Sequence, residues 1–411
     1  MRKTTITVFG GLSAKKDKSA YFLFYTVAQY FFEKGMLEKI VCLGFEKDID
    51  IDRSLIQTPG IFIQAIFRII SLLKTLFPGI QVRALKEWIF DLFCCRNIVI
   101  DKEMILLNLK PTVPMTIKRI KRNTQGKDIT VVSLASIAHP RFNSTMVRAI
   151  QKKYDLPNRS TYTNEKRVSR IEEAYKESDK VLLMVRSKFI FETYRRYGVD
   201  EQKLLYLGTN SAGVDTNVFK PTEHQRDKNT LVFLTLGNLT LIKGTPMLLD
   251  AWKGVQNKNI VDARLVLSGN TDADYKELRN RAQWQSINQI ETTGYVSNLV
   301  AAYQAADIFI AASVSDNGPA TVLEAMSCGL PVIVSTHCGY SEYIREGVDG
   351  FTYDPFDVDS LERLIIWFCQ NRDKIPEMGR KSRERAKDFP VRAYVEQVYS
   401  ACYSAPGMSM G

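Results

Sequence analysis

Two carboxylates frame a stretch of the chain whose residue types predict the start of a helix. Asp316 and Glu324 stand eight positions apart within residues 312–335, which are predicted to run as strand, turn, helix, turn and strand. The first turn of a helix presents unpaired backbone N–H groups and the positive end of the helix dipole, so it can receive a phosphate group or sugar hydroxyls. Such an anion cradle beside two hydrogen-bond-accepting carboxylates suits a nucleotide sugar. Its main-chain donors would be the amides around Gly318, Ala320 and Thr321.

The bounds of this helix are predicted from local chemistry. Ser315, Asp316 and Asn317 are residue types that cap helix N-termini, and Pro319 has the fixed φ of a first helical turn. Gly329 suits the left-handed position that ends a helix. The amides at the helix start are therefore expected at a fixed place, at the carboxyl edge of a sheet.

A lysine precedes a second predicted helix start. Residues 234–252 are predicted to form a strand, a loop that contains Asn238 and Lys243, and a helix. The ammonium group of Lys243 would project at the carboxyl edge of the sheet, where it could neutralise a diphosphate. A lysine without such a partner would simply be solvated, so its position alone leaves both interpretations open.

Short apolar runs alternate with helical patterns in the second half of the chain, which predicts a parallel sheet wrapped by crossover helices. The runs are continuous rather than alternating, as expected for strands buried on both faces. The predicted strands are Leu231–Leu236, Arg264–Leu267, Ile308–Ala311 and Pro331–Val334. The predicted helices are residues 245–253, 272–283, 297–305 and 319–328.

The first half shows the same alternation less clearly, so two α/β domains in tandem are expected. Its predicted strands are Thr5–Phe9, Lys39–Leu43, Met104–Leu107, Ile129–Leu134 and Lys180–Met184. A stretch rich in glycine, asparagine and proline predicts the linker between the two domains. The expected domains are residues 1–205 and 221–388, with 206–220 as the linker and 389–411 as a C-terminal helical segment. Ligands of such sheets bind beyond the carboxyl ends of the strands, so two facing domains would form one cleft.

Length and composition exclude several classes of protein. A chain of 411 residues exceeds what one hydrophobic core serves, and 45% hydrophobic residues exclude a disordered chain. The seven cysteines show no disulfide framework, and three separated histidines form no local zinc site. The first residues lack the apolar core of a signal peptide. A cytoplasmic protein without a metal is therefore expected.

The net charge of +11 is concentrated in the first half of the chain. Residues 1–200 hold 35 Lys and Arg against 20 Asp and Glu (+15), and residues 201–411 hold 21 against 25 (−4). This asymmetry predicts a polyanionic partner, although it can also serve solubility. No nucleic-acid-binding module is recognisable, so nucleic acid is not expected as the partner.

The apolar segment 61–77 is predicted to be an amphipathic helix. It is too short to span a bilayer and carries two charges. It is either a core helix that exposes one polar stripe or an interfacial helix on an anionic membrane, helped by the basic run at 118–122. The polar residues that form the stripe, at steps of four, three and four, are Gln64, Arg68, Ser71 and Thr75.

Several ordered motifs resemble the donor-binding domain of the family 4 glycosyltransferases, which are retaining enzymes with the GT-B fold. This resemblance implies two Rossmann-like, doubly wound domains facing across a cleft, with the C-terminal helix crossing back to the first domain. It covers most of the chain, with weaker likeness at 6–11 and 172–187. The matching motifs are GVDTNVFKP at 213–221, the G-x-L-x-x-x-KG loop at 237–244, SGN at 268–270, GYV at 294–296, AADIFIAAS at 305–313, the carboxylate-x7-carboxylate signature at 316–324 and GYSEYIREGVDGF at 339–351.

The resemblance also implies roles for individual residues. Lys243 would contact the donor diphosphate, Glu324 would hold the ribose hydroxyls, and Asp316 would contact the transferred sugar. His139 resembles an acceptor-domain histidine that faces the reacting sugar, although a lone histidine before a proline can equally be structural. Main-chain contacts would come from Gly10 and Gly11 near the diphosphate, from Gly294, Tyr295 and Val296 at the base, and from Asn317, Gly318, Pro319, Ala320 and Thr321 at the sugar and distal phosphate.

Two positions depart from the family pattern. Asp316 stands in place of a glutamate, and Asn238 stands where the family has an arginine on the diphosphate. Loss of that guanidinium weakens leaving-group stabilisation. Either Lys15, Lys16 or Lys18 substitutes for it, or activity is low. A different donor sugar would also explain the aspartate.

The expected function is retaining, metal-independent transfer of a hexose from a nucleotide sugar, a UDP-sugar in the first instance. The expected acceptor is a glycan or lipid-linked molecule at the cytoplasmic face of the membrane, as in cell-surface polysaccharide or lipopolysaccharide synthesis, with peripheral contact to anionic lipid. No cofactor is expected beyond the nucleotide sugar as co-substrate. The alternatives are a non-catalytic nucleotide-sugar-binding subunit and a transferase with a small soluble acceptor.

Overall fold

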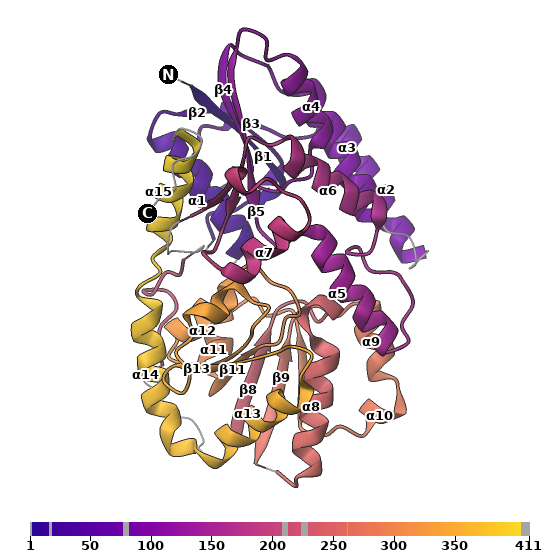
Figure 1. The fold of residues 1–411 in the computed structure, drawn as a ribbon, viewed down its shortest axis with the longest axis vertical. Coiled ribbons are helices and arrows are strands. Elements are labelled where there is room, and N and C mark those ends of the chain that lie inside the picture. The colour runs from indigo at the N-terminus through magenta and orange to yellow at the C-terminus, as the bar shows by residue number, and fades with distance from the viewer. Residues whose placement is uncertain are drawn as a thin grey trace. The chain divides into compact units, whose positions relative to one another are not determined.

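The computed structural model describes residues 2–15, 19–76, 82–207, 213–222, 229–260 and 262–403. Its contacts divide the chain into two compact units (Figure 1). Unit 1 consists of Met1–Arg186, Ile190–Thr209 and Tyr394–Gly411, and unit 2 consists of Ser187–Phe189 and Asn210–Ala393. Residues 208–212, which belong to the predicted linker, lie outside the described residues.

Unit 1 contains a seven-stranded parallel sheet in the order β3-β2-β1-β4-β5-β6-β7 among its described residues. Its strands are β1 (Lys3–Leu12), β2 (Leu37–Phe45), β3 (Ile56–Gln57), β4 (Glu103–Asn108), β5 (Asp128–Ala135), β6 (Lys180–Leu183) and β7 (Leu204–Tyr206). Its helices are α1 (Ser19–Glu33), α2 (Ile61–Leu76), α3 (Val82–Asn97), α4 (Pro114–Arg122), α5 (Pro140–Lys153), α6 (Glu165–Glu177), α7 (Lys188–Arg196) and α15 (Val391–Tyr403). All five strands predicted for the first half are present.

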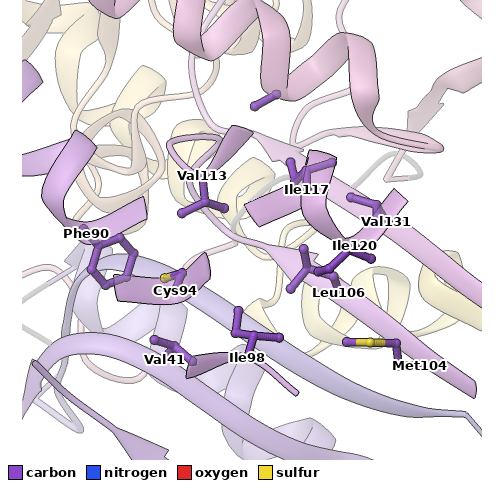
Figure 2. Close-up of a cluster of buried hydrophobic side chains, with 11 residues drawn as sticks. Val41, Phe90, Cys94, Ile98, Met104, Leu106, Val113, Ile117, Ile120 and Val131 are labelled. Carbon is purple, nitrogen blue, oxygen red and sulfur yellow. The ribbon is translucent and has the colours of Figure 1, made fainter. Parts of the chain in front are cut away.

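One hydrophobic cluster of unit 1 lies between the central strands and helices of the unit. Figure 2 shows side chains of β2, β4 and β5 meeting those of α3 and α4. Burying such apolar surface is the main favourable contribution to folding. The cluster consists of Val41, Phe90, Cys94, Ile98, Met104, Leu106, Val113, Ile117, Ile120, Val131 and Ala174.

Helix α15 belongs to unit 1 from Tyr394 onwards, although it follows unit 2 in the chain. The ring of Tyr399 meets Tyr30 and Phe31 of α1 at centroid distances of 5.5 and 5.1 Å. The Tyr403 hydroxyl lies 2.8 Å from the Thr4 hydroxyl of β1. Through these contacts the C-terminal helix packs against α1 and β1 of unit 1.

Unit 2 contains a six-stranded parallel sheet in the order β10-β9-β8-β11-β12-β13 among its described residues. Its strands are β8 (Leu231–Leu236), β9 (Ala263–Ser268), β10 (Ile290–Gly294), β11 (Ile308–Ala311), β12 (Val332–Ser335) and β13 (Gly350–Tyr353). Its helices are α8 (Thr245–Asn257), α9 (Ala273–Arg279), α10 (Ala282–Gln285), α11 (Leu299–Gln304), α12 (Ala320–Ser327), α13 (Val358–Gln370) and α14 (Ile375–Ala386). The four predicted strands are present, whereas the helix predicted at 272–283 is two short helices, α9 and α10.

Helix α2 exposes apolar side chains. Ile70 is buried, whereas Ile61 is 88% exposed and Phe62 is 78% exposed. The interpretation as a core helix that exposes only a polar stripe is therefore wrong. No helix in the described ranges is both long and apolar enough to cross a membrane. The other exposed apolar residues of α2 are Ile69, Leu72, Leu73 and Leu76.

Two of the four basic residues at 118–122 form ion pairs inside unit 1. Lys118 forms an ion pair with Glu173, and Lys121 forms one with Asp179. These pairs join α4 to α6 and to the residue before β6. The run therefore offers less free positive charge than its sequence predicts.

Candidate functional site

Lys243 is held at the carboxyl end of the unit 2 sheet by a tight loop. It ends the 3-10 turn Leu241–Lys243, and Gly244 follows with a φ of 71°. A Cβ on Gly244 would lie 1.8 Å from the carbonyl oxygen of Ala312, just after β11. Glycine alone satisfies both the left-handed backbone and this close approach. The loop thereby fixes where the Lys243 side chain begins.

The Lys243 ammonium forms an ion pair with the Asp316 carboxylate. The Lys243 side chain is 35% exposed and that of Asp316 is 12% exposed, so the ammonium can meet a ligand while the carboxylate is mostly covered. The Ser313 hydroxyl lies 3.5 Å from the same carboxylate oxygen. The sequence predicted both Lys243 and Asp316 at the site but not their contact.

The backbone of Asp316 is fixed by hydrogen bonds to the segment after β12. Its N–H donates to the carbonyl of His337 at 2.9 Å, and its carbonyl accepts from Gly339 N–H at 3.0 Å. Asp316 also forms an isolated parallel bridge with Cys338. This two-sided attachment directs the carboxylate towards Lys243.

Helix α12 begins at a different cap from the one predicted. Pro319 occupies the N-cap with φ −64° and ψ 119°, and it makes no side-chain cap hydrogen bond. Ser315, Asp316 and Asn317 therefore lie before the cap. Gly329 follows the helix at φ 82°, as predicted. An N-cap without a side-chain acceptor leaves the opening amides to a ligand or to water.

A small cavity joins the strand ends, the Lys243 loop and the start of α12. Four predicted site residues, Asn238, Lys243, Pro319 and Thr321, line it together with Ser313. Positive charge from the ammonium and the helix dipole meets there. The described residues contain no group of three His, Cys, Asp or Glu side chains placed to hold a metal ion.

Glu324 is buried on α12, with 4% of its surface exposed. The Tyr303 hydroxyl of α11 donates a 2.7 Å hydrogen bond to its carboxylate. Burial raises the pKa of Glu324 to about 7, against the lowering effect of the Tyr303 hydrogen bond. The carboxyl group is thus poised between its two protonation states near neutral pH.

The segment Gly294–Val296 leaves the end of β10 beside a groove of about 410 Å³. Tyr295 and Val296 line the groove with Ser268 and Thr293, and the Tyr295 side chain is 65% exposed. Gly294 has a φ of 72°, and its carbonyl accepts from Gly269 N–H at 2.8 Å. The predicted base-contacting segment is therefore accessible.

Asn238 lies exposed after β8, where its side-chain oxygen is 3.4 Å from the amide nitrogen of Asn270. The lysines suggested as substitutes for the missing arginine belong to the first half of the chain. Lys15 forms an ion pair with Glu46 at 3.8 Å within unit 1. Lys16 and Lys18 lie outside the described residues.

His139 is a buried helix cap in unit 1. Its Nδ1 accepts from Arg141 N–H at 3.3 Å at the start of α5, and its ring stacks on Tyr197 at a centroid distance of 5.0 Å. Burial lowers the pKa of His139 to about 3, and the charge of Arg141 adds to that lowering. The ring is therefore neutral. These contacts give His139 a structural role as the cap of α5.

Gly10 and Gly11 lie inside β1 rather than in a loop after it. Gly11 pairs with Gly44 of β2, past an irregularity in the register after Val8. A Cβ on Gly10 would lie 3.3 Å from the Tyr21 ring and 3.5 Å from the Lys110 ammonium. Neighbouring atoms therefore already lie within 4 Å of the place where a Cβ would stand at either glycine.

A known protein family matches the part of the chain that holds the candidate site of unit 2. The sequence model of the family described as glycosyl transferases group 1 matches residues 218–388. These residues carry the Lys243 loop, the start of α12, Glu324 and the β10 segment. The similarity to this family therefore lies within unit 2.

Curated relatives match part of the chain. Sulfoquinovosyl transferase SQD2 of Arabidopsis thaliana is 29% identical over 165 residues, covering 39% of this chain and 32% of its own. The putative glycosyltransferase EpsD of Bacillus subtilis is 25% identical over 202 residues, covering 46% of this chain and 53% of its own. The matches thus span a third to about half of these relatives.

Solved structures share the fold over both units. The HepE protein of Anabaena, in complex with UDP and glucose, superposes with a TM-score of 0.67 at 15% identity, covering 98% of this chain and 100% of its own. Sucrose-phosphate synthase from Thermosynechococcus elongatus superposes with a TM-score of 0.63, also at 15% identity. Together with the two parallel sheets, this likeness shows a GT-B fold of two Rossmann-like domains.

Sequence reasoning missed two features of unit 2. Tyr303, which holds Glu324, lies on a six-residue helix, and nothing local marks its hydroxyl as a partner. Cys338, which bridges to Asp316, follows the predicted strand at the end of the signature region. Both partners come from other elements, so only the fold brings them to the site.

Proposed function

We propose that the chain is a glycosyltransferase that moves a hexose from a nucleotide sugar, a UDP-sugar in the first instance, to an acceptor hydroxyl. The observation that carries this proposal is the partly exposed Lys243 side chain beside the start of α12, which has no side-chain cap. Such an arrangement binds a diphosphate through an ammonium and main-chain amides. The group 1 match and the binding of UDP and glucose by HepE support the choice of donor.

In the proposed reaction the bond between the sugar C1 and the diphosphate oxygen breaks, and a bond from C1 to the acceptor oxygen forms on the same face. The departing phosphate takes the proton of the acceptor hydroxyl, so no side-chain base is required. Lys243 and the α12 amides offset the charge that develops on the diphosphate. The configuration at C1 is retained, and the protein itself supplies the positive charge that stabilises the departing diphosphate.

The remaining site residues would position the donor. Glu324 is proposed to accept hydrogen bonds from the ribose, with Tyr303 fixing its carboxylate. Asp316 is proposed to meet the sugar while it keeps the Lys243 ammonium in place. Tyr295 and Val296 would border the base.

Donor binding is tested by thermal unfolding of the full chain with UDP, GDP, ADP and their glucose conjugates. At a hundredfold excess over Kd, a ligand of the folded state contributes about 2.7 kcal/mol, which should raise Tm by about 5 °C. UDP and UDP-glucose are expected to give the largest shifts. A flat response to every nucleotide at millimolar concentration contradicts the proposal.

A non-catalytic binding subunit remains the second candidate, because Asn238 and Asp316 replace the two residues that the resembling family uses at the diphosphate and sugar. It predicts the same thermal shift without turnover. Release of UDP from UDP-glucose, as the glucose is transferred to an acceptor or slowly to water, distinguishes an enzyme from a binding subunit.

We further propose that the acceptor is a glycan or lipid-linked molecule at the cytoplasmic face of a membrane, to which the protein binds peripherally. The exposed apolar residues of α2 support this, and Leu85 and Trp88 of α3 add exposed apolar surface at 46% and 43%. Helices α2 and α3 pack against each other. Apolar surface of this kind lies at a lipid interface more favourably than in water.

Membrane binding is tested by sedimentation with phosphatidylglycerol vesicles at low salt. The wild type should sediment with the vesicles, and Phe62→Asp should reduce the bound fraction several-fold because it places a charge on the apolar face of α2. Phe356→Asp is the matched control, since Phe356 is 37% exposed in unit 2. A wild type that stays in solution supports a small soluble acceptor instead.

A further inference from the structure

Two residues join the loop after β11 to the loop that carries Lys243. Val314, which is fully buried, donates its N–H to the carbonyl of Ile242 at 2.9 Å. Two residues later, the Asp316 carboxylate forms the ion pair with the Lys243 ammonium. The place of the ammonium therefore depends on where the loop at 313–316 is held.

His337, in the loop after β12, contacts both of these residues. Its carbonyl accepts from Asp316 N–H at 2.9 Å, and its imidazole Nδ1 lies 2.9 Å from the carbonyl oxygen of Val314. The main chain of any residue could make the first contact, but the second requires a side chain with a donor at this position. The histidine side chain thus fixes the loop after β11 where that loop meets the Lys243 loop.

The imidazole is a neutral donor. A carbonyl oxygen only accepts hydrogen bonds, so Nδ1 carries a proton. Burial lowers the pKa of His337, while its hydrogen bond to Val314 and the charge of Asp354 act in the opposite direction. The ring is therefore mostly uncharged at pH 7. Its contact with Val314 is a hydrogen bond between neutral groups, which contributes up to about tenfold in an equilibrium constant.

The surroundings of the ring hold it in this orientation. It stacks on Phe189 at a centroid distance of 4.8 Å and meets Phe356 edge to face at 6.1 Å, both within unit 2. The N–H of His337 donates to the Ser335 hydroxyl at 3.1 Å, and that hydroxyl donates to the carbonyl of Ser313. A ring that is already packed in place loses little conformational freedom when it makes its hydrogen bond.

We propose that His337 is a positioning residue of the donor site. Its hydrogen bond to Val314 holds the loop after β11 so that Asp316 keeps the Lys243 ammonium beside the start of α12. The inference rests on the proposed function in its last step alone, which is the use of that ammonium on a diphosphate. The position of the ammonium can therefore be tested without a ligand.

Two substitutions separate the hydrogen bond of His337 from the packing of its ring. In His337→Asn the side-chain amide can place an N–H where Nδ1 stands but has no ring to stack, whereas His337→Phe keeps a ring and lacks the donor. His337→Leu takes the place of His337→Phe if that protein does not fold, as judged by circular dichroism. Thr336→Ala, which changes the exposed neighbour in the same loop, is the matched control.

The first readout is the rate at which a trace of acetic anhydride acetylates Lys243 in the full chain without ligand, relative to the exposed Lys258. The reagent attacks an uncharged amine, so an ammonium held by a carboxylate reacts more slowly. Asp316→Asn should raise the relative rate about fivefold by removing the ion pair, and His337→Phe should come within about twofold of that value. His337→Asn and Thr336→Ala should react at the wild-type rate.

An unchanged rate in Asp316→Asn or in His337→Phe overturns the inference. A raised rate in His337→Asn also overturns it, because the stacked ring and not the hydrogen bond would then position the loop. A histidine that only stabilises the fold would lower Tm and leave the labelling of the folded protein unchanged.

The second readout is kcat for the release of UDP from UDP-glucose. His337→Phe should lower kcat about tenfold in the wild-type background but less than about twofold in Asp316→Asn, because a residue that acts through Asp316 then has little left to hold. No loss, or an equal loss in both backgrounds, overturns the inference. A wild type that binds UDP-glucose and never releases UDP contradicts the proposed function instead, and the labelling then decides the role of His337.

Discussion

Replacing Lys243 with methionine is expected to lower the rate of sugar transfer from UDP-glucose by about 10²–10³-fold. The ammonium is the side-chain cation that pairs with Asp316 and lines the cavity at the start of α12. Removing a preorganised group that stabilises developing charge typically costs that much in rate. UDP release, measured under saturating donor, checks the prediction, and UDP affinity measured by calorimetry should fall as well.

The control for this change is Lys258→Met, which removes an exposed lysine from the end of α8. It should leave both the rate and the UDP affinity within twofold of wild type. A Lys243→Met protein that keeps wild-type turnover would show that the diphosphate is stabilised elsewhere. Retained UDP affinity with lost turnover would instead place the role of Lys243 in the transition state alone.

Gly244→Ala is expected to destabilise unit 2 by about 3 kcal/mol or more, because two independent costs add. The left-handed φ of 71° disfavours alanine, and the new Cβ would lie 1.8 Å from the Ala312 carbonyl oxygen. The loop can avoid the clash only by leaving the end of β11. Differential scanning calorimetry should show a lower Tm, and donor binding should weaken as Lys243 moves.

Gly347→Ala separates the two costs. Gly347 has nearly the same φ, 70°, but its Cβ would meet only an atom of the Phe351 ring, at 3.9 Å. It should therefore cost about 1 kcal/mol, from backbone conformation alone. Equal losses of stability in the two variants would mean that the loop at Gly244 relaxes without strain.

The inner strands of both sheets were predictable from their apolar runs, and the edge strands β3, β7, β10 and β13 were not. Leu231–Leu236 and Ile308–Ala311 have the predicted bounds because a strand buried on both faces needs apolar side chains at every position. Edge strand β10, Ile290–Gly294, is rich in threonine and partly exposed, so its sequence gives no such run. The short strand β3 is likewise set by pairing with β2 rather than by its own residues.

The candidate site was predictable where its chemistry is local in sequence. Spacing alone placed Asp316 and Glu324 around the start of α12, and Lys243 before a helix. The long-range partners were not predictable, because the contact of Tyr303 with Glu324 depends on how α11 packs against α12.

The membership of α15 in unit 1 sets an order for folding during synthesis. A nascent chain that has emerged from the ribosome through residue 390 already holds every described strand of both sheets. It still lacks Tyr399, so the aromatic rings of Tyr30 and Phe31 wait without this partner. Of the two units, unit 1 is therefore begun first and completed last during synthesis.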